Sequence, residues 1–200
     1  MKSHALKLGV AAAATLALAA CNNNGAGNKT EPAQTPAAQK AAGNKTIAAG
    51  LTSDAKFMAA AKAAGLDQTL AGPGPYTVFV PSDAAIDAAP AGTFDAKPDN
   101  RGQLTGVITN LILPGTVMAA DIGKAIDAAK GKAVLATMGG GTITATKDGD
   151  KIVLTDSQGH KATVTQADDQ FSNGVVHHVD AVLMPPKGQA AKPAVGQKAG

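Results

Sequence analysis

The sequence predicts an α+β domain in which helices come first and a set of strands follows. Apolar residues recur near helical spacing between Thr46 and Leu70. From Lys132 onward, short runs rich in Val, Ile and Thr alternate with turn residues, a pattern typical of strands. The run Asn173–Pro186 is the longest strongly β-prone stretch, and we expect it to close the sheet.

The helical part is predicted to contain several pieces. Ser53 or Asp54 is placed to cap a run that continues to Ala64, and Gly65 stops it. After a Pro- and Gly-rich turn, Tyr76–Pro81 reads as a short strand, and Ser82 or Asp83 offers the next N-cap. We expect the later helices at Ser82–Ala88, Arg101–Leu113 and Ala119–Ala129.

The strands are expected to form an antiparallel meander. Asp148-Gly149 predicts a tight hairpin, and Ser157–His160 predicts a further turn. We expect Asp168-Asp169 to form a solvated acidic loop ahead of the last strand. The predicted strands are Ala133–Met138, Thr142–Lys147, Lys151–Thr155 and Ala162–Gln166.

The final strand carries two adjacent histidines, His177 and His178. Adjacent residues of a strand point to opposite faces, so these two are not expected to share one metal ion. His177 shares a face with Val175 and Val179, and we expect it in the core with its hydrogen bonds satisfied. We expect His178 to face solvent.

Two stretches together resemble the paired signature segments of the fasciclin (FAS1) domain. They are Thr77–Ile86, TVFVPSDAAI, and Asn173–Asp180, NGVVHHVD, which is followed by VLMP. They lie about 100 residues apart, as in the family, and the resemblance covers residues 46–186. The signature positions, with a structural or interaction role, are Thr77, Phe79, Pro81, Ser82, Asp83, Asn173, Gly174, His177 and Asp180.

The resemblance implies a wedge-like β-sandwich with N-terminal and flanking helices, and it implies adhesion rather than catalysis. One departure limits what is carried over. Where the family usually has a Tyr-His pair, implicated in cell binding in animal members, this chain has Asn110-Leu111. That particular activity is therefore not expected here.

Enzymatic and metal sites find little support in the sequence. Ser82, Asp83 and His177 could suggest a nucleophilic triad, but no nucleophile-elbow motif surrounds Ser82, and helix capping explains its position. Gly139–Gly141 joins two strands rather than opening a helix, so it does not resemble a phosphate loop. Asp148–Asp150 has too few ligands for a calcium loop. We expect no cofactor and no metal.

The chain begins with what reads as a lipoprotein leader. Lys2 and Lys7 precede an apolar run of thirteen residues, and Leu18-Ala19-Ala20-Cys21 resembles a bacterial lipobox. In that class Cys21, the chain's one cysteine, is lipidated after cleavage. The alternative is an ordinary secretory leader. We expect residues 21–45 and 187–200 to be disordered, because they contain almost no large apolar residue.

Charge and composition exclude nucleic-acid binding. The chain has a formal charge of +3, but residues 46–186 hold ten Lys and Arg against fourteen Asp, a balance of −4. A nucleic-acid footprint requires a basic patch on the domain itself. With no Trp, one Tyr and four Phe, the chain also lacks aromatic residues for stacking bases or sugars.

These observations together predict a monomeric, non-enzymatic, lipid-anchored surface domain. Its partners would be the membrane, through the anchor, and a protein, matrix or glycan surface. Its location would be the outer membrane, the periplasm or the cell surface. The alternative is an envelope protein that binds a small apolar ligand or glycan, and that alternative calls for a deep apolar pocket.

Overall fold

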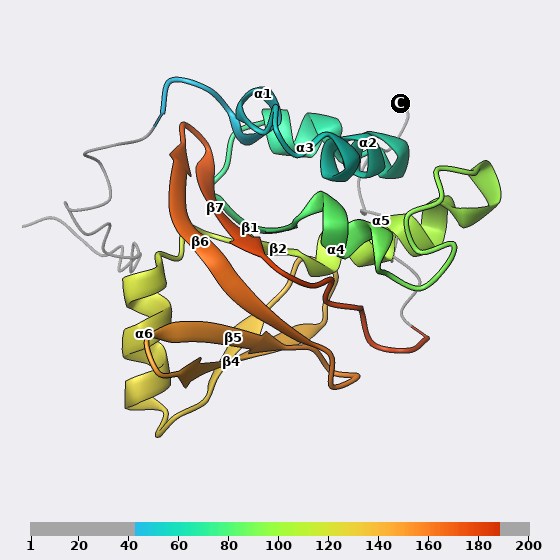
Figure 1. The fold of residues 1–200 in the computed structure, drawn as a ribbon. Helices are drawn as coiled ribbons and strands as arrows, with labels where there is room; N and C mark the ends of the chain where they lie inside the picture. The colour runs from blue at the N-terminus through green and yellow to red at the C-terminus, as the bar shows by residue number, and fades with distance from the viewer. Residues whose placement is uncertain (1–42, 189–200) are drawn as a thin grey trace, which may run out of the picture. The chain divides into compact units, whose positions relative to one another are not determined.

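Helices and strands are segregated in a computed structural model, which describes residues 43–188 (Figure 1). The α+β prediction is confirmed. The helices are α1 (Ile47–Gly50), α2 (Ala55–Ala64), α3 (Asp67–Ala71), α4 (Asp83–Asp87), the 3₁₀ helix η2 (Pro98–Asn100), α5 (Arg101–Asn110) and α6 (Ala119–Ala128). The strands are β1 (Tyr76–Pro81), β2 (Ile112–Pro114), β3 (Ala133–Ala136), β4 (Thr142–Asp148), β5 (Lys151–Thr155), β6 (Lys161–Phe171) and β7 (Gly174–Val179).

The seven strands of residues 43–188 belong to one sheet, in the order β2-β1-β7-β6-β5-β4-β3. Only the β1–β7 pair is parallel, and the other pairs are antiparallel. The sheet curls until its two ends approach each other, where the Met138 N–H donates to the Ile112 carbonyl oxygen at 2.7 Å. The two layers expected of a sandwich are therefore halves of one nearly closed sheet. β7 lies inside that sheet, between β1 and β6.

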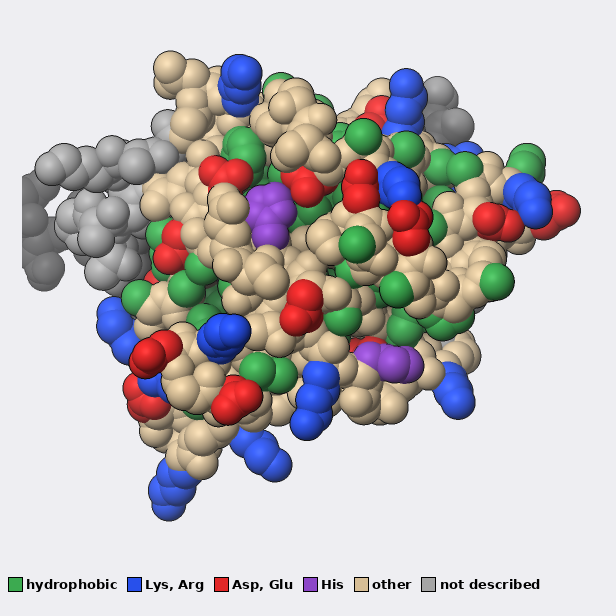
Figure 2. All heavy atoms as spheres, viewed as in Figure 1, with side chains coloured by type: hydrophobic (Ala, Val, Ile, Leu, Met, Phe, Trp, Pro, Cys, Tyr) green, Lys and Arg blue, Asp and Glu red, His purple; other side chains and the backbone are tan. Residues whose placement is uncertain are grey.

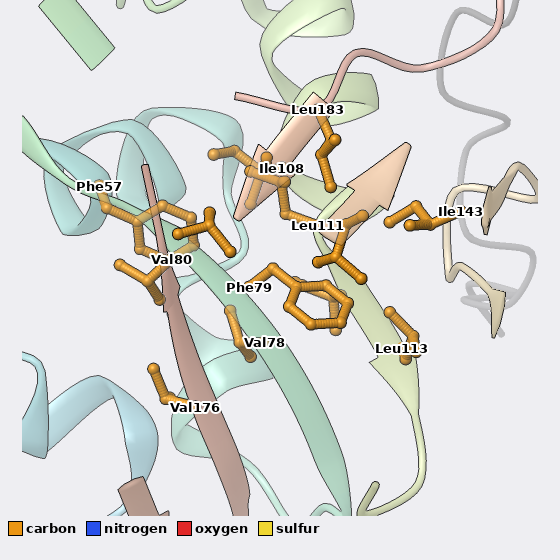
Figure 3. Packing of buried hydrophobic residues seen from close by; sticks show 14 of the residues in the cluster. Phe57, Val78, Phe79, Val80, Ile108, Leu111, Leu113, Ile143, Val176 and Leu183 are labelled. Carbon is orange, nitrogen blue, oxygen red and sulfur yellow. The ribbon is translucent and has the colours of Figure 1, made fainter. Parts of the chain in front are cut away.

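The core lies on both sides of β1 and β7. Figure 3 shows Val78 and Val80 on the side of Phe57 from α2, whereas Phe79 points toward Leu111 and Leu113. Val78, Phe79 and Val80 have no solvent exposure. This is the burial expected of a parallel pair covered on both faces. Helices α1 to α3 lie along one side of these strands, and α6 lies beside β4 and β5 (Figure 1).

The helical stretch predicted between Thr46 and Leu70 consists of three short helices, α1 to α3, and the predicted stop at Gly65 is confirmed. α2 ends at Gly65, whose φ of 79° is left-handed and suits glycine. Asp54 occupies the N-cap position of α2, as predicted, but its side chain makes no capping hydrogen bond. Its carboxylate instead accepts a hydrogen bond from the Ser53 hydroxyl.

Two boundaries differ because pairing in the folded chain overrides local pattern. The predicted helix Arg101–Leu113 ends at Asn110, and the next residues form β2 against β1. The predicted strand Ala162–Gln166 extends through Phe171, so the acidic loop expected at Asp168-Asp169 is instead part of β6. Register shifts between Val164 and Asp169 break the alternation that would have marked this strand in the sequence.

Candidate functional site

The two signature segments lie side by side at the centre of the sheet. β1 and β7 run parallel, with Thr77 opposite Val175, Phe79 opposite His177, and Pro81 opposite Val179. Stretches about 100 residues apart in the sequence thus form one unit, which we call the β1–β7 junction. A parallel pair needs a long crossover connection, and here the intervening helices and strands supply it.

His177 is fully buried in this junction, and both of its ring nitrogens are hydrogen-bonded. Nε2–H donates to the Val117 carbonyl oxygen at 2.8 Å, and Nδ1 accepts the Asp168 N–H at 3.1 Å. This pattern requires the neutral Nε2–H tautomer. The Phe79 ring lies beside it, with centroids 5.6 Å apart. No nitrogen lone pair remains to bind a metal or to accept a proton from a substrate.

Burial lowers the pKa of His177 below its ordinary value of 6.5. The hydrogen bond to the Val117 carbonyl and the charge of Asp168 act in the opposite direction, and nearby His178 adds to the lowering. The net direction favours the neutral ring, in agreement with the hydrogen-bond pattern.

Thr77 and Asp168 complete the hydrogen-bonded frame around His177. The Thr77 hydroxyl donates to the Gly115 carbonyl and accepts the Val117 N–H, both at 2.8 Å. A carboxylate oxygen of Asp168 accepts the Ala119 N–H at 2.7 Å, at the first residue of α6. The sheet therefore holds the segment from Gly115 to the start of α6 by side chains from three strands.

Asp168 was missed as an organising residue because its neighbours suggested a loop. Its φ of 62° is left-handed, which Asp tolerates better than most residues. The bulge turns its backbone N–H toward His177 and its carboxylate toward α6. The available signal was weak: Asp is among the residues that most often adopt a left-handed backbone conformation.

Asn173 and Gly174 form the entry to β7. The Asn173 side chain accepts the Ile47 N–H at 2.8 Å and donates to the carbonyl oxygens of Leu70 and Gly72, each at 2.8 Å. It therefore ties α1 and the end of α3 to the sheet. Gly174 follows with φ 157°, and a Cβ there would overlap the Tyr76 carbonyl oxygen. A side chain at this position is incompatible with the close approach of β1.

The remaining signature residues do not assemble a catalytic group. The Ser82 hydroxyl accepts the Ala85 N–H as the N-cap of α4, and Asp180 accepts the Thr163 N–H at 2.6 Å. Pro81 ends β1 opposite Val179. Asp83 begins α4, and within the described residues its buried Oδ1 has no hydrogen-bond partner. Ser82 and His177 are committed to different partners, so no triad forms.

His178 occupies the opposite face of β7 from His177, but it is not as exposed as expected. Its side chain is 19% exposed, with Nδ1 3.6 Å from Asp54 Oδ1 and Nε2 4.0 Å from Asp169 Oδ2. The prediction of a solvent-facing residue is wrong because the start of α2 and the extended β6 flank this position. The described residues contain no group of three ligands suited to a metal ion.

Two further buried polar residues, Asp156 and Asn110, bind backbone groups of the segment that follows β7. Asp156 Oδ1 accepts the N–H groups of Gln158 and His160, and its Oδ2 accepts the Met184 N–H. Asn110, where this chain departs from the family pattern, donates to the Leu183 carbonyl oxygen and accepts a hydrogen bond from the Thr137 hydroxyl. An Asp at the head of a Gly-containing turn was the available signal for Asp156.

The surface offers open hollows and mixed charge. A hollow of about 340 Å³ lies between α5 and the segment Met184–Gly188, and one of about 380 Å³ lies between α6 and the β4–β5 hairpin. Figure 2 shows acidic and basic side chains interspersed over one face. In the described range, residues 43–188, no helix has the length and apolar character needed to cross a bilayer. The predicted lipidation site, Cys21, and most of both polar ends lie outside the described residues.

Comparisons with known proteins agree with the fold. Residues 54–185 match the family model of the fasciclin domain. The chain is 36% identical over 143 residues to protein sll1483 of Synechocystis sp., which covers 70% of this chain and 72% of that protein. It is 31% identical over 150 residues to transforming growth factor-beta-induced protein ig-h3 of Sus scrofa, covering 70% of this chain and 19% of that one.

A solved structure, a FAS1 domain pair from the insect cell adhesion molecule fasciclin I, has the same fold. The TM-score is 0.53 at 20% identity, covering 66% of this chain. The chain spans 45% of that neighbour.

Proposed function

Because the chain belongs to the fasciclin domain family, we propose that it is a non-enzymatic interaction domain, displayed on the cell envelope and anchored there by a lipid on Cys21. Fasciclin domains are generally non-catalytic and often take part in adhesion or protein interaction. The observation that carries the proposal is the hydrogen bonding of the His177 ring. Both of its nitrogens bind within the chain, so the most chemically versatile residue of the signature supports the fold.

The adhesive part of the proposal draws on the surface as well as the family. The solved neighbour is described as part of a cell adhesion molecule. Adhesive domains work through exposed surfaces, and here the hollows are open while the polar side chains of the β1–β7 junction point inward. The partner is proposed to be a protein, matrix or glycan surface.

Anchoring is tested by Cys21→Ser. The thiol is the attachment atom of the proposed lipid, and stable anchoring needs more than one acyl chain. We expect the wild-type protein in the membrane fraction and the variant in the soluble fraction. A matched melting temperature for the two proteins would show that the variant is folded. Equal membrane retention would contradict the anchor.

Adhesion is tested with cells that display the wild-type protein. We expect them to attach to surfaces coated with matrix protein or glycan more than cells expressing Cys21→Ser, which would release the domain. Adding the released domain to the medium should compete with attachment. Attachment that is unchanged by display, on every coating, would contradict an adhesive role.

The second candidate is a binding protein for a small apolar ligand. The hollow beside α5 favours it, because Val107, Met184 and Pro185 line a volume at the lower end of the range for ligand sites. Its opening to solvent makes it the weaker proposal. We expect the apolar dye 1-anilinonaphthalene-8-sulfonate to bind here if this function holds, and Gly102→Leu to displace it. No dye binding to the folded chain would remove this candidate.

A further inference from the structure

The dipeptide Asn173-Gly174 has a chemical reactivity that depends on its conformation. In an open chain, the backbone nitrogen of the residue after an asparagine can attack the carbon of the side-chain amide. Glycine in that second position favours the attack, because it has no side chain to hinder ring closure. The chain contains two such dipeptides, Asn173-Gly174 and Asn24-Gly25. The second lies outside the described residues, in the segment 21–45 whose composition predicts disorder.

The side-chain amide of Asn173, which this reaction attacks, is fixed by three hydrogen bonds. Its Oδ1 accepts the Ile47 N–H, and its Nδ2 donates to the carbonyl oxygens of Leu70 and Gly72, each at 2.8 Å. Both hydrogens of the amide nitrogen are therefore bound to backbone groups. Asn173 is also only 7% exposed, so little water reaches it. The amide carbon is thus held toward α1 and the end of α3.

The attacking nitrogen, that of Gly174, is held separately by the sheet. It belongs to the peptide group between Asn173 and Gly174, whose carbonyl oxygen accepts the Tyr76 N–H at 3.0 Å. The packing here is close: a Cβ at Gly174 would overlap the Tyr76 carbonyl oxygen, and a Cβ at Gly74 would overlap the Asn173 carbonyl oxygen. Ring closure requires the side chain and this peptide group to rotate toward each other. The folded chain opposes both rotations, because the two groups are bound to different elements.

We propose that Asn173-Gly174 is a deamidation site that is closed in the folded domain and open in the unfolded chain. The Gly174 backbone nitrogen forms a bond to Asn173 Cγ, and its proton passes to the amide nitrogen Nδ2. The Cγ–Nδ2 bond breaks and ammonia leaves. Water then opens the resulting cyclic imide at either of its two carbonyl carbons. The products carry aspartate or isoaspartate at position 173, and no oxidant or reductant is needed.

Either product opposes folding, because the reaction removes groups that this site uses. Aspartate has no N–H to donate to the carbonyl oxygens of Leu70 and Gly72, and its charge would lie buried beside them. Isoaspartate adds one carbon to the backbone at the entry to β7, where β1 already lies too close for a side chain. A chain that stays unfolded long enough to react therefore folds less readily afterwards, whereas a chain that folds promptly is protected.

Deamidation rates in the folded and the unfolded chain test the protection. The purified full chain is incubated in mildly alkaline buffer, with and without denaturing urea, and each site is followed by peptide mass spectrometry. Asn24-Gly25 controls for the direct effect of urea on the reaction. We expect Asn173 to react at least about ten-fold more slowly without urea, because the folded site must open first. Equal rates at Asn173 in the two conditions, or no reaction there in urea, would overturn the proposal.

Refolding tests the consequence of the modification. Chain that has reacted in urea is brought to a urea concentration just below its unfolding midpoint, and compact and expanded molecules are separated by size exclusion. We expect deamidation at Asn173 to be enriched several-fold in the expanded fraction, whereas deamidation at Asn24 divides evenly and controls for general damage. An even division at Asn173 as well would contradict the expected effect on folding. Neither measurement depends on anchoring or adhesion, so failure here would leave the proposed function standing.

Discussion

The two faces of β7 are covered in different ways, and their neighbouring histidines show the difference. His177 has no exposed side-chain surface and two hydrogen bonds to backbone groups. His178, one residue later, keeps 19% of its side chain exposed and lies between Asp54 and Asp169. One face is held by short hydrogen bonds to buried backbone groups, and the other by longer contacts between the His178 ring and two carboxylates.

This difference shows that the residue pattern of a strand does not by itself determine how each of its faces is covered. Both faces of β7 contain β-branched residues, and Val175 and Val176 are equally buried. The two histidines differ because different segments cover the two faces. The segment from Gly115 to α6 covers the His177 face, whereas the start of α2 and part of β6 lie beside His178. Mutations at the junction and on each face should therefore differ in size.

The largest expected effect is at Gly174, where both faces begin. Gly174→Ala would place a Cβ against the Tyr76 carbonyl and push β7 away from β1. We expect a loss of about 4 kcal/mol or more in unfolding free energy, the size reserved for severe disruption. Gly149→Ala is the control: its φ is also positive, at 58°, but a Cβ there meets open space, so about 1 kcal/mol is expected from backbone strain. Urea denaturation measures both, and equal losses would contradict the close approach.

The next effect is at Asn173, which joins the helical side to the sheet. Asn173→Asp keeps the side-chain shape but removes the two N–H donors to the carbonyl oxygens of Leu70 and Gly72. Each carbonyl left without a partner is expected to cost about 1–3 kcal/mol of unfolding free energy. Asn100→Asp is the counterpart whose side-chain hydrogen bonds are solvent-exposed, and we expect a loss of about 0.5 kcal/mol there. If chemical denaturation gave similar losses for the two variants, Asn173 would not be the tie between the layers.

The histidine pair tests the comparison directly. His177→Ala leaves the Val117 carbonyl and the Asp168 N–H without partners, and we expect a loss of about 1–3 kcal/mol. His178→Ala removes only the longer, partly exposed contacts to Asp54 and Asp169, worth about 1 kcal/mol or less. Single-mutant thermal melts decide the order. A wild-type melting temperature for His177→Ala, accompanied by loss of a bound ligand, would favour the binding-protein candidate.

The smallest expected effect is in the pH dependence. Because burial depresses the pKa of His177, the unfolded chain takes up a proton near pH 6.5 while the folded chain does not. The stability from this residue is therefore complete above pH 6.5 and declines as the pH falls toward the folded pKa. His177→Gln, which keeps a donor and an acceptor but does not titrate, should show a flatter stability profile between pH 7 and pH 5. The same slope in both proteins would mean that other groups govern it.

Much of the fold could be predicted from residue patterns. Ser82 as a cap, Gly65 as a stop and the Asp148-Gly149 hairpin are local features, and they appear where the sequence indicated. The partners of Asn173 and His177 could not be predicted. Ile47, Leu70 and Val117 lie far from them in the chain, and only the folded sheet brings the groups together.

The errors share the same physical cause. β2 continues a helical apolar run, and the polar end of β6 reads as a loop, so both were assigned from local pattern alone. Pairing with β1 and β7 overrode that pattern in each case.

Three hydrogen bonds join the start of the described chain to the end of β6 and the turn that follows it. The Gly43 N–H donates to Gln170, the Lys45 carbonyl accepts the Ser172 N–H, and the Ile47 N–H donates to Asn173. Tension applied ahead of Gly43 therefore reaches the turn between β6 and β7 first. It would peel these bonds one after another before it loaded the parallel β1–β7 pair, whose hydrogen bonds share a load together. Residues 43–47 would therefore detach first under force, while the strands of the sheet stay paired.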